Sequence, residues 1–132
     1  MILGVGVDVL HIPRLRSLLA RRDPAALARR ILSRAELDEW SGVKVDDRLS
    51  ERYLALRWTA KEATYKALYP HVKARWADLL VQKDGSKPLV RLSEDFGPAP
   101  IALSDQHQLR LHLSVSHDAD VMIAYVIAEV LS

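Results

Sequence analysis

Two residues one helical turn apart combine the side-chain types that phosphate chemistry requires. Glu62 and Lys66 stand four positions apart in a segment with a helical pattern, so their side chains share one face of the helix. A carboxylate there can bind Mg²⁺, which takes one or two protein carboxylates plus phosphates and water, while the ammonium contacts phosphate oxygens. The same spacing is also that of an ordinary surface ion pair, worth about 0.3–0.5 kcal/mol. Both interpretations stay open for the pair alone.

A second carboxylate, Asp8, stands in a β-rich opening segment. Over residues 2–10 the strand period of two places Gly4, Gly6 and Asp8 on one face and larger apolar residues on the other. Glycines inside a strand indicate close approach of a ligand or of another backbone, so the pattern predicts an outward-facing carboxylate on a face without bulk. A structural role for Asp8, as a helix cap or an ion-pair partner, is the alternative.

Short polar side chains and a histidine close a predicted strand late in the chain. Over residues 109–117 apolar and polar residues alternate, which is typical of a half-buried strand. Ser114, Ser116 and His117 could hydrogen-bond a phosphate or a ribose at its end, although such residues are also common at solvated turns. The histidines do not form a credible metal set, and the absence of cysteine excludes thiolate zinc sites, disulfides and a cysteine nucleophile.

The positive charge of the chain is concentrated near its beginning. The 132 residues include 19 Lys and Arg against 17 Asp and Glu, a net charge of +2. Up to residue 34 there are seven arginines against two aspartates, whereas the remainder is net acidic. Such a segment can attract nucleic acid, an anionic membrane or an acidic protein, or it can be a solvated helix face.

A long helix is the strongest periodic signal in the chain. Apolar residues at alternating spacings of four and three predict a helix over residues 48–68, with its apolar seam packed inward. Arg57 and Lys61 fall largely off that seam and would add positive charge to the site. Proline and capping patterns over residues 13–40 predict three short helices before it.

The remaining segments have the patterns of strands. Residues 78–81 and 89–92 flank an Asp-Gly turn, which predicts a hairpin. Residues 109–117 and 121–131 predict two strands paired with each other, preceded by a loop over residues 93–108 with room for one helical turn. One strand, a helical block and then mostly strands indicate an α+β fold with an antiparallel sheet packed against the long helix.

Length and composition limit the class of protein. A length of 132 residues favours a single domain over residues 1–132, and an apolar fraction of 49% excludes an intrinsically disordered chain. No run approaches the roughly eighteen apolar residues of a membrane span, and the first residues lack the pattern of a signal peptide. We therefore expect neither a membrane protein nor a secreted one.

Three motifs occur together and in order, and together they resemble the signatures of a known family. They are GVGVD at residues 4–8, RWTAKEATYKA at residues 57–67 and SVSH at residues 114–117. They resemble the 4′-phosphopantetheinyl transferases, and most closely the short, single-unit branch of holo-acyl-carrier-protein synthases. The resemblance implies Mg²⁺-dependent transfer of 4′-phosphopantetheine from coenzyme A to a serine of an acyl carrier protein, with release of 3′,5′-ADP.

The resemblance also implies a role for each matching position. Asp8 and Glu62 would bind the metal, and Glu62 and Lys66 would act in catalysis. The residues implied around coenzyme A are Arg57, Lys66, Pro88, Ser114, Ser116 and His117. The positive charge of this segment and the usual docking helix of the family together imply that the acidic carrier protein binds at Arg14, Arg16, Arg21 and Arg22. The serine proton would pass to Glu62 or to a water on the metal.

The resemblance extends to assembly and compartment. Short members of the family are trimers with active sites between subunits, which implies a homotrimer here. His11 stands where many members have a glutamate, and together with Leu10 it favours the short branch. Residues 68–71 replace a glycine-rich stretch of bacterial members, and residues 65–70 look more like eukaryotic organellar members. The expected compartment is the cytoplasm, with the mitochondrion as the alternative.

Two rival functions remain on the sequence alone. A nucleic-acid-binding module could use the same arginines, but the rest of the chain is net acidic and its strands show no aromatic base-stacking platform. A different Mg²⁺-dependent phosphate-ester enzyme could use the same fold and the same acids. We expect neither nucleic acid nor a membrane as a partner.

Overall fold

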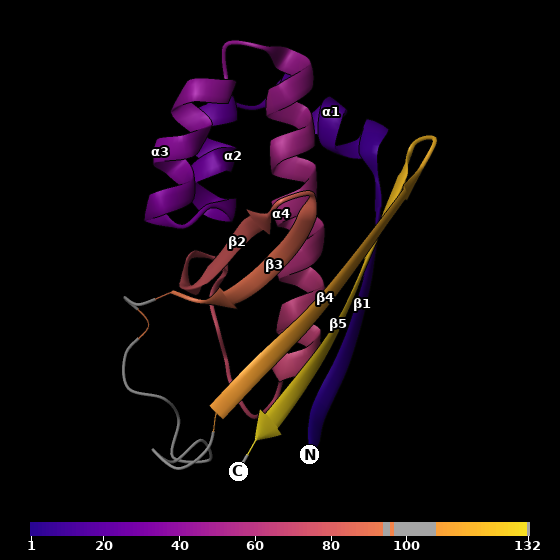
Figure 1. Cartoon of the computed structure of the whole chain (residues 1–132). Coiled ribbons are helices and arrows are strands. Elements are labelled where there is room, and N and C mark those ends of the chain that lie inside the picture. Colours follow the sequence, from indigo (N-terminus) through magenta and orange to yellow (C-terminus); the bar gives the residue numbers. More distant parts are fainter. Residues whose placement is uncertain (94–95, 97–107, 132) are drawn as a thin grey trace.

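The computed structural model describes residues 1–93, 96 and 108–131, in which a helical block is followed by strands (Figure 1). Strand β1 (Ile2–His11) leads to α1 (Ile12–Arg21), α2 (Pro24–Ile31), α3 (Arg34–Val43) and α4 (Asp47–Leu68). A 3₁₀ turn, η1 (Trp76–Asp78), precedes β2 (Leu79–Asp84), β3 (Lys87–Leu92), β4 (Gln108–Asp118) and β5 (Val121–Leu131). The order confirms the predicted α+β class. The loop predicted over residues 93–108 lies mostly outside the described residues.

The helices begin where the local sequence predicts. Asp23 caps α2, whose first residue is Pro24, and Ser33 with Glu36 forms the capping box of α3. Helix α4 begins one residue before the predicted start and ends at Leu68, as predicted. No helix in the described part of the chain is long and apolar enough to cross a membrane.

The strands form two antiparallel sheets. One has the order β1-β5-β4, which confirms the predicted pairing of the last two strands and adds β1 on the other side of β5. The other is the predicted hairpin β2-β3, whose turn contains Gly85 at φ 61°. Figure 1 shows α4 running along the three-stranded sheet, with α2 and α3 on the side of α4 away from that sheet.

The glycines of β1 allow the strand to touch helix α4 backbone to backbone. A Cβ on Gly6 would lie 1.8 Å from the carbonyl oxygen of Ala63, and one on Gly4 would lie 2.1 Å from that of Ala67. The predicted close approach is therefore to another backbone, that of α4. The predicted orientation was wrong, because the glycine and Asp8 face points inward against the helix instead of outward.

The opposite face of the sheet is apolar and exposed. Val5, Val7 and Val9 of β1 stand beside Ile123 and Tyr125 of β5, and all five are exposed. We call these residues the outer sheet face. A single chain leaves this contiguous apolar surface in contact with water.

Candidate active site

The contact between β1 and α4 brings together two of the predicted site residues. The Lys66 ammonium donates to the carbonyl oxygen of Val7 at 3.0 Å and lies 3.3 Å from Oδ1 of Asp8. The Lys66 side chain is 49% exposed, so its ammonium remains accessible to a ligand. The Asp8 side chain is 15% exposed, so a smaller part of it reaches the surface beside Lys66.

Glu62 completes the cluster one helical turn before Lys66. Burial raises the pKa of the Glu62 carboxyl, and the negative charge of Asp8 raises it further. The positive charge of the Lys66 ammonium and the nearby Trp76 indole oppose this shift. We call Asp8, Glu62 and Lys66 the acidic cluster. It contains two carboxylates that repel each other and an ammonium beside them.

This pair of carboxylates suits a hard cation completed by other ligands. Among the described residues, no group of three or more His, Cys, Asp or Glu side chains is arranged to hold a metal ion. Mg²⁺ usually takes only one or two protein carboxylates, together with phosphate oxygens and water. Asp8 and Glu62 match that donor set, and the mutual repulsion seen in the raised pKa of Glu62 is what a divalent cation would relieve.

Arg57 lies apart from this cluster, in the interior. Its guanidinium is 3.5 Å from the centroid of the Tyr53 ring, and Nη2 donates to the carbonyl oxygen of Val81 at 3.4 Å. Carboxylate oxygens of Glu36 and Glu39 lie 3.7 and 3.9 Å from it. Only 6% of the Arg57 side chain is exposed, so the prediction that it adds free positive charge beside Glu62 was wrong.

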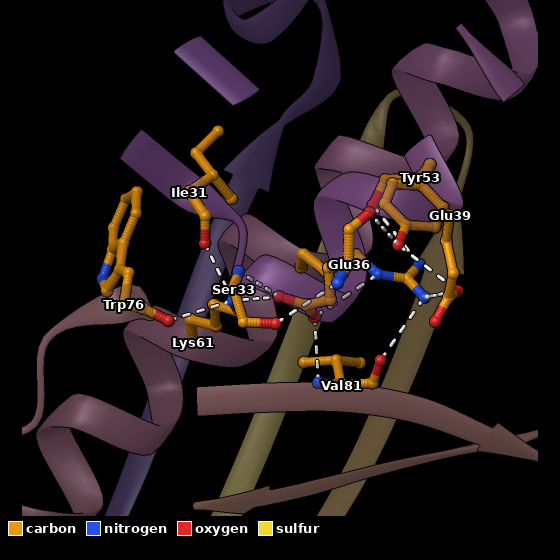
Figure 2. A network of polar contacts seen from close by, with 9 residues as sticks. Ile31, Ser33, Glu36, Glu39, Tyr53, Lys61, Trp76 and Val81 are labelled. Carbon is orange, nitrogen blue, oxygen red and sulfur yellow. Dashed lines mark hydrogen bonds and ion pairs between the residues drawn. The ribbon is translucent and has the colours of Figure 1, made fainter. Parts of the chain in front are cut away.

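The sequence pattern also predicted the wrong environment for Lys61. Its side chain is fully buried, and Nζ donates to the carbonyl oxygens of Ile31 at 2.8 Å and Trp76 at 3.0 Å. The third partner is the carboxylate of Glu36, which is also fully buried (Figure 2). Burial lowers the pKa of the Lys61 ammonium, and the negative charge of Glu36 opposes that shift.

The strand-end residues do not meet the acidic cluster within one chain. Ser114 and Ser116 pair with Tyr125 and Ile123, so their side chains are on the same side of the sheet as the outer sheet face. Asp8 is on the other side of the sheet. His117 is on the other side of the sheet and lines an open groove together with Arg57.

Pro88 lies near that same groove. It pairs across the hairpin with Lys83, which is one of the groove's lining residues. The predicted coenzyme A ligands therefore divide into three places: the acidic cluster, the groove and the outer sheet face.

The predicted docking arginines stand on or just beyond helix α1, and all are exposed. Arg16 differs from the others, because it makes two hydrogen bonds of 2.9 Å with the carboxylate of Glu51. Arg22 borders a small pocket with Leu18 and Trp58. An apolar depression thus lies next to the positive charge of this helix.

A model of the 4′-phosphopantetheinyl transferase superfamily matches residues 4–126. The chain belongs to this superfamily. The match covers all three sequence motifs, and it confirms the resemblance that those motifs indicated.

Similar proteins of known class span nearly the whole chain. A holo-[acyl-carrier-protein] synthase of Anaeromyxobacter sp. (strain K) is 38% identical over 130 residues, covering 98% of this chain and 97% of the relative. The crystal structure of the synthase from Neisseria meningitidis matches with a TM-score of 0.76 and 29% identity, over 98% of this chain and 99% of that one. The Bacillus anthracis synthase, solved in complex with CoA (3′,5′-ADP), matches with a TM-score of 0.70 and 28% identity, over 97% and 96%. The predicted enzyme class and fold are confirmed.

Proposed function

We propose that this enzyme transfers 4′-phosphopantetheine from coenzyme A to a serine hydroxyl of an acyl carrier protein and releases 3′,5′-ADP. The observation that carries the proposal is the cluster of Asp8, Glu62 and Lys66 where β1 meets α4. Full-length relatives named holo-[acyl-carrier-protein] synthase, one of them solved with CoA (3′,5′-ADP), support this choice of substrates.

Asp8 and Glu62 are the residues that would hold Mg²⁺ in this reaction. When bound, Mg²⁺ neutralises the charge of a pyrophosphate and orients the leaving phosphate. Two carboxylates close enough to repel each other, beside the exposed ammonium of Lys66, support the assignment.

Lys66 and Glu62 would be the catalytic residues of the protein. The exposed ammonium of Lys66 stands where phosphate oxygens would meet the two acids, and there it stabilises charge that develops in the transition state. The serine proton needs an acceptor, and the Glu62 carboxylate or a water molecule would take it.

We further propose that the enzyme is a homotrimer with its active sites between subunits. The outer sheet face supports association, because exposed apolar surface of this kind is characteristic of protein interfaces. Ser114 and Ser116 border that face, so association there would bring them to a neighbouring subunit. Such a neighbour could present them to coenzyme A held at the acidic cluster, although one chain alone keeps them apart.

The acidic carrier protein would dock on helix α1. Arg14, Arg21 and Arg22 supply exposed positive charge, and the pocket beside Leu18 could accept an apolar side chain of the carrier. Arg16 contributes less in this proposal, because its guanidinium is already paired with Glu51. We keep the cytoplasm as the proposed compartment.

One experiment tests the proposed function against its rivals. Apo carrier protein is incubated with the enzyme, coenzyme A and Mg²⁺, and its mass is measured. A gain of one phosphopantetheine group, absent when a chelator removes Mg²⁺, is the expected result. An unchanged carrier mass with coenzyme A cleaved would favour another phosphate-ester enzyme, and an unchanged mass with intact coenzyme A would exclude both activities.

A further inference from the structure

Two exposed tyrosines are stacked on each other at the end of helix α4. The rings of Tyr65 and Tyr69 have centroids 5.8 Å apart and planes inclined by 30°. Tyr65 is 37% exposed and Tyr69 is 52% exposed. The backbone N–H of Tyr69 donates to the carbonyl oxygen of Tyr65 at 2.9 Å, so the helical spacing continues to the second ring. The pair therefore presents aromatic surface to water from a regular helix.

The tyrosine pair adjoins the acidic cluster on the surface of the helix. Tyr65 is three positions after Glu62, and Tyr69 is three positions after Lys66. Residues three apart on a helix are neighbours, with Cβ atoms about 5–6 Å from each other. The Lys66 side chain is itself 49% exposed. The ammonium that we propose as a phosphate contact and the two rings thus share one stretch of exposed surface.

The chemistry of coenzyme A indicates which part of the molecule would use this surface. Adenine is its aromatic part, and a single ribose joins the base to the phosphates. Aromatic side chains stack on a base without matched hydrogen bonds, because every base has a π face. The phosphopantetheine arm leaves the other end of the pyrophosphate and is a flexible chain of amides without a ring. Tyrosine rings beside a phosphate-binding cation therefore match the nucleotide better than the arm.

We propose that Tyr65 and Tyr69 form a stacking platform for the adenine of coenzyme A when its phosphates lie at Lys66. The contact between the two rings fixes the plane that the base meets, which lowers the ordering cost of binding. This inference rests on the proposed function, because it takes coenzyme A as the substrate and Lys66 as a phosphate contact. It adds two residues to which the sequence motifs assigned no role.

The test removes the aromatic face and keeps a side chain of substantial size. Tyr69→Leu retains an apolar side chain at an exposed position, so the fold should be unaffected, but leucine has no π face for a base. Tyr69→Phe keeps the ring, loses only the hydroxyl and should therefore rescue the affinity. Val45→Leu changes a valine that is 86% exposed and precedes the start of α4, and it serves as the control for a surface substitution elsewhere.

Affinities of the full-length enzyme are measured by isothermal titration calorimetry with Mg²⁺ present. The ligands are coenzyme A, 3′,5′-ADP, which lacks the arm, and inorganic pyrophosphate, which lacks both the arm and the base. For Tyr69→Leu we expect the Kd of coenzyme A and that of 3′,5′-ADP to rise by a common factor of about ten, the typical contribution of one stacked base. The Kd of pyrophosphate should stay within twofold of wild type. Tyr69→Phe and Val45→Leu should stay within twofold for every ligand.

Each other outcome overturns the platform. A weaker affinity for coenzyme A alone, with that for 3′,5′-ADP unchanged, would place Tyr69 at the phosphopantetheine arm. Unchanged affinity for both would mean that the ring contacts neither part of coenzyme A, and an equal loss for pyrophosphate would mean that the substitution disturbs the phosphate contacts.

The same measurements keep this proposal separate from the proposed function. The proposed function fails by itself if the wild type binds coenzyme A but leaves the apo carrier protein unmodified, and the affinities of the tyrosine variants do not depend on that result. A wild-type enzyme that binds neither coenzyme A nor 3′,5′-ADP would refute both.

Discussion

The ammonium of Lys66 lies 3.3 Å from Oδ1 of Asp8, although the two residues are 58 positions apart in the sequence. The short distance depends on two glycines of β1, since any side chain there would collide with the backbone of α4. Cation and carboxylate are therefore held together by main-chain packing, which leaves both side chains free to take other partners at the surface.

Loss of either acid should abolish transfer without unfolding the enzyme. Asp8→Ala and Glu62→Ala each remove a proposed Mg²⁺ ligand, whose charge stabilisation is worth several kcal/mol, so turnover should fall by about 10²-fold or more. Turnover over a range of Mg²⁺ concentrations and far-ultraviolet circular dichroism check this. Near-normal turnover at low Mg²⁺ in either variant would contradict the metal assignment.

Lys66→Ala should lower kcat more than it weakens Mg²⁺ binding. The ammonium would stabilise charge that appears in the transition state, and losing such a group typically costs about 10²–10³-fold in kcat. Lys73→Ala, at another exposed lysine, serves as the control and should leave kcat unchanged. If Lys66→Ala shows normal turnover and only a slightly lower melting temperature, Lys66 is an ion-pair partner of Asp8 and nothing more.

The stability of the metal-free enzyme should depend on the charge of Glu62. Because its pKa is raised in the folded state, Glu62 favours folding at low pH, and that contribution is lost as the pH rises through the folded pKa. Glu62→Gln should therefore melt at a higher temperature than wild type at pH 7 with chelator present. The difference should shrink toward pH 4, where the wild-type carboxyl is also protonated.

Asp78→Asn is the control for that experiment, because this substitution should change the stability in the opposite direction. A hydrogen bond from Arg75 holds the pKa of Asp78 below its usual value, so this carboxylate stabilises the fold at neutral pH and loses that effect in acid. At pH 7 Asp78→Asn should melt below wild type and Glu62→Gln above it, and the Asp78 difference should persist down to about pH 4 and fade only in stronger acid, where that carboxylate protonates. A common direction would refute the electrostatic interpretation.

Removing the arginines of α1 should weaken the encounter with carrier protein. Replacing Arg14, Arg16, Arg21 and Arg22 by Ser should raise the KM for the carrier and flatten its dependence on salt, while coenzyme A affinity stays nearly constant. The single variant Arg16→Ser should have the smallest effect of the four, because Glu51 already pairs with Arg16. An equal loss of coenzyme A affinity in the quadruple variant would place these arginines at the nucleotide.

A charge on the outer sheet face should break the proposed trimer. Val7→Glu places a carboxylate among apolar side chains of that face, and burying it against a second copy without a partner is unfavourable. Light scattering should then report a monomer, and transfer should fall with it. Val45→Glu alters an exposed valine, 86% accessible, outside this face and should leave mass and activity unchanged.

Local sequence patterns predicted where the helices begin and end, but they did not predict how deeply individual side chains of those helices are buried. The bounds of α4 follow from apolar spacing, and the starts of α2 and α3 follow from capping residues, all of which act within a few neighbours. Burial depends instead on what packs against each face. Lys61 and Arg57 lie off the apolar seam, yet α3 and β2 cover that side of the helix and supply Glu36 as a partner.

The candidate site was predictable in part for the same reason. Glu62 and Lys66 share a helix face, and the glycines marked β1 as a strand in close contact with something. The glycines leave open whether a ligand or another backbone approaches their face, so the sequence alone did not show that Asp8 faces helix α4 and that Ser114 faces away from it. The hydrogen bond from Lys61 to the carbonyl oxygen of Trp76 had no signal in the sequence, because it is entirely tertiary.

The strand order of the larger sheet bears on when the enzyme can become active during synthesis. Within the described residues, β1 pairs with only one strand, β5, although β1 carries Asp8 and emerges first from the ribosome. Its hydrogen-bonding partner is translated more than a hundred residues later, and such non-local pairing forms slowly. Until β5 is made, β1 can pack against helices such as α4 but lacks its paired strand, so the sheet can hold Asp8 in register beside Lys66 only once the last strand has formed.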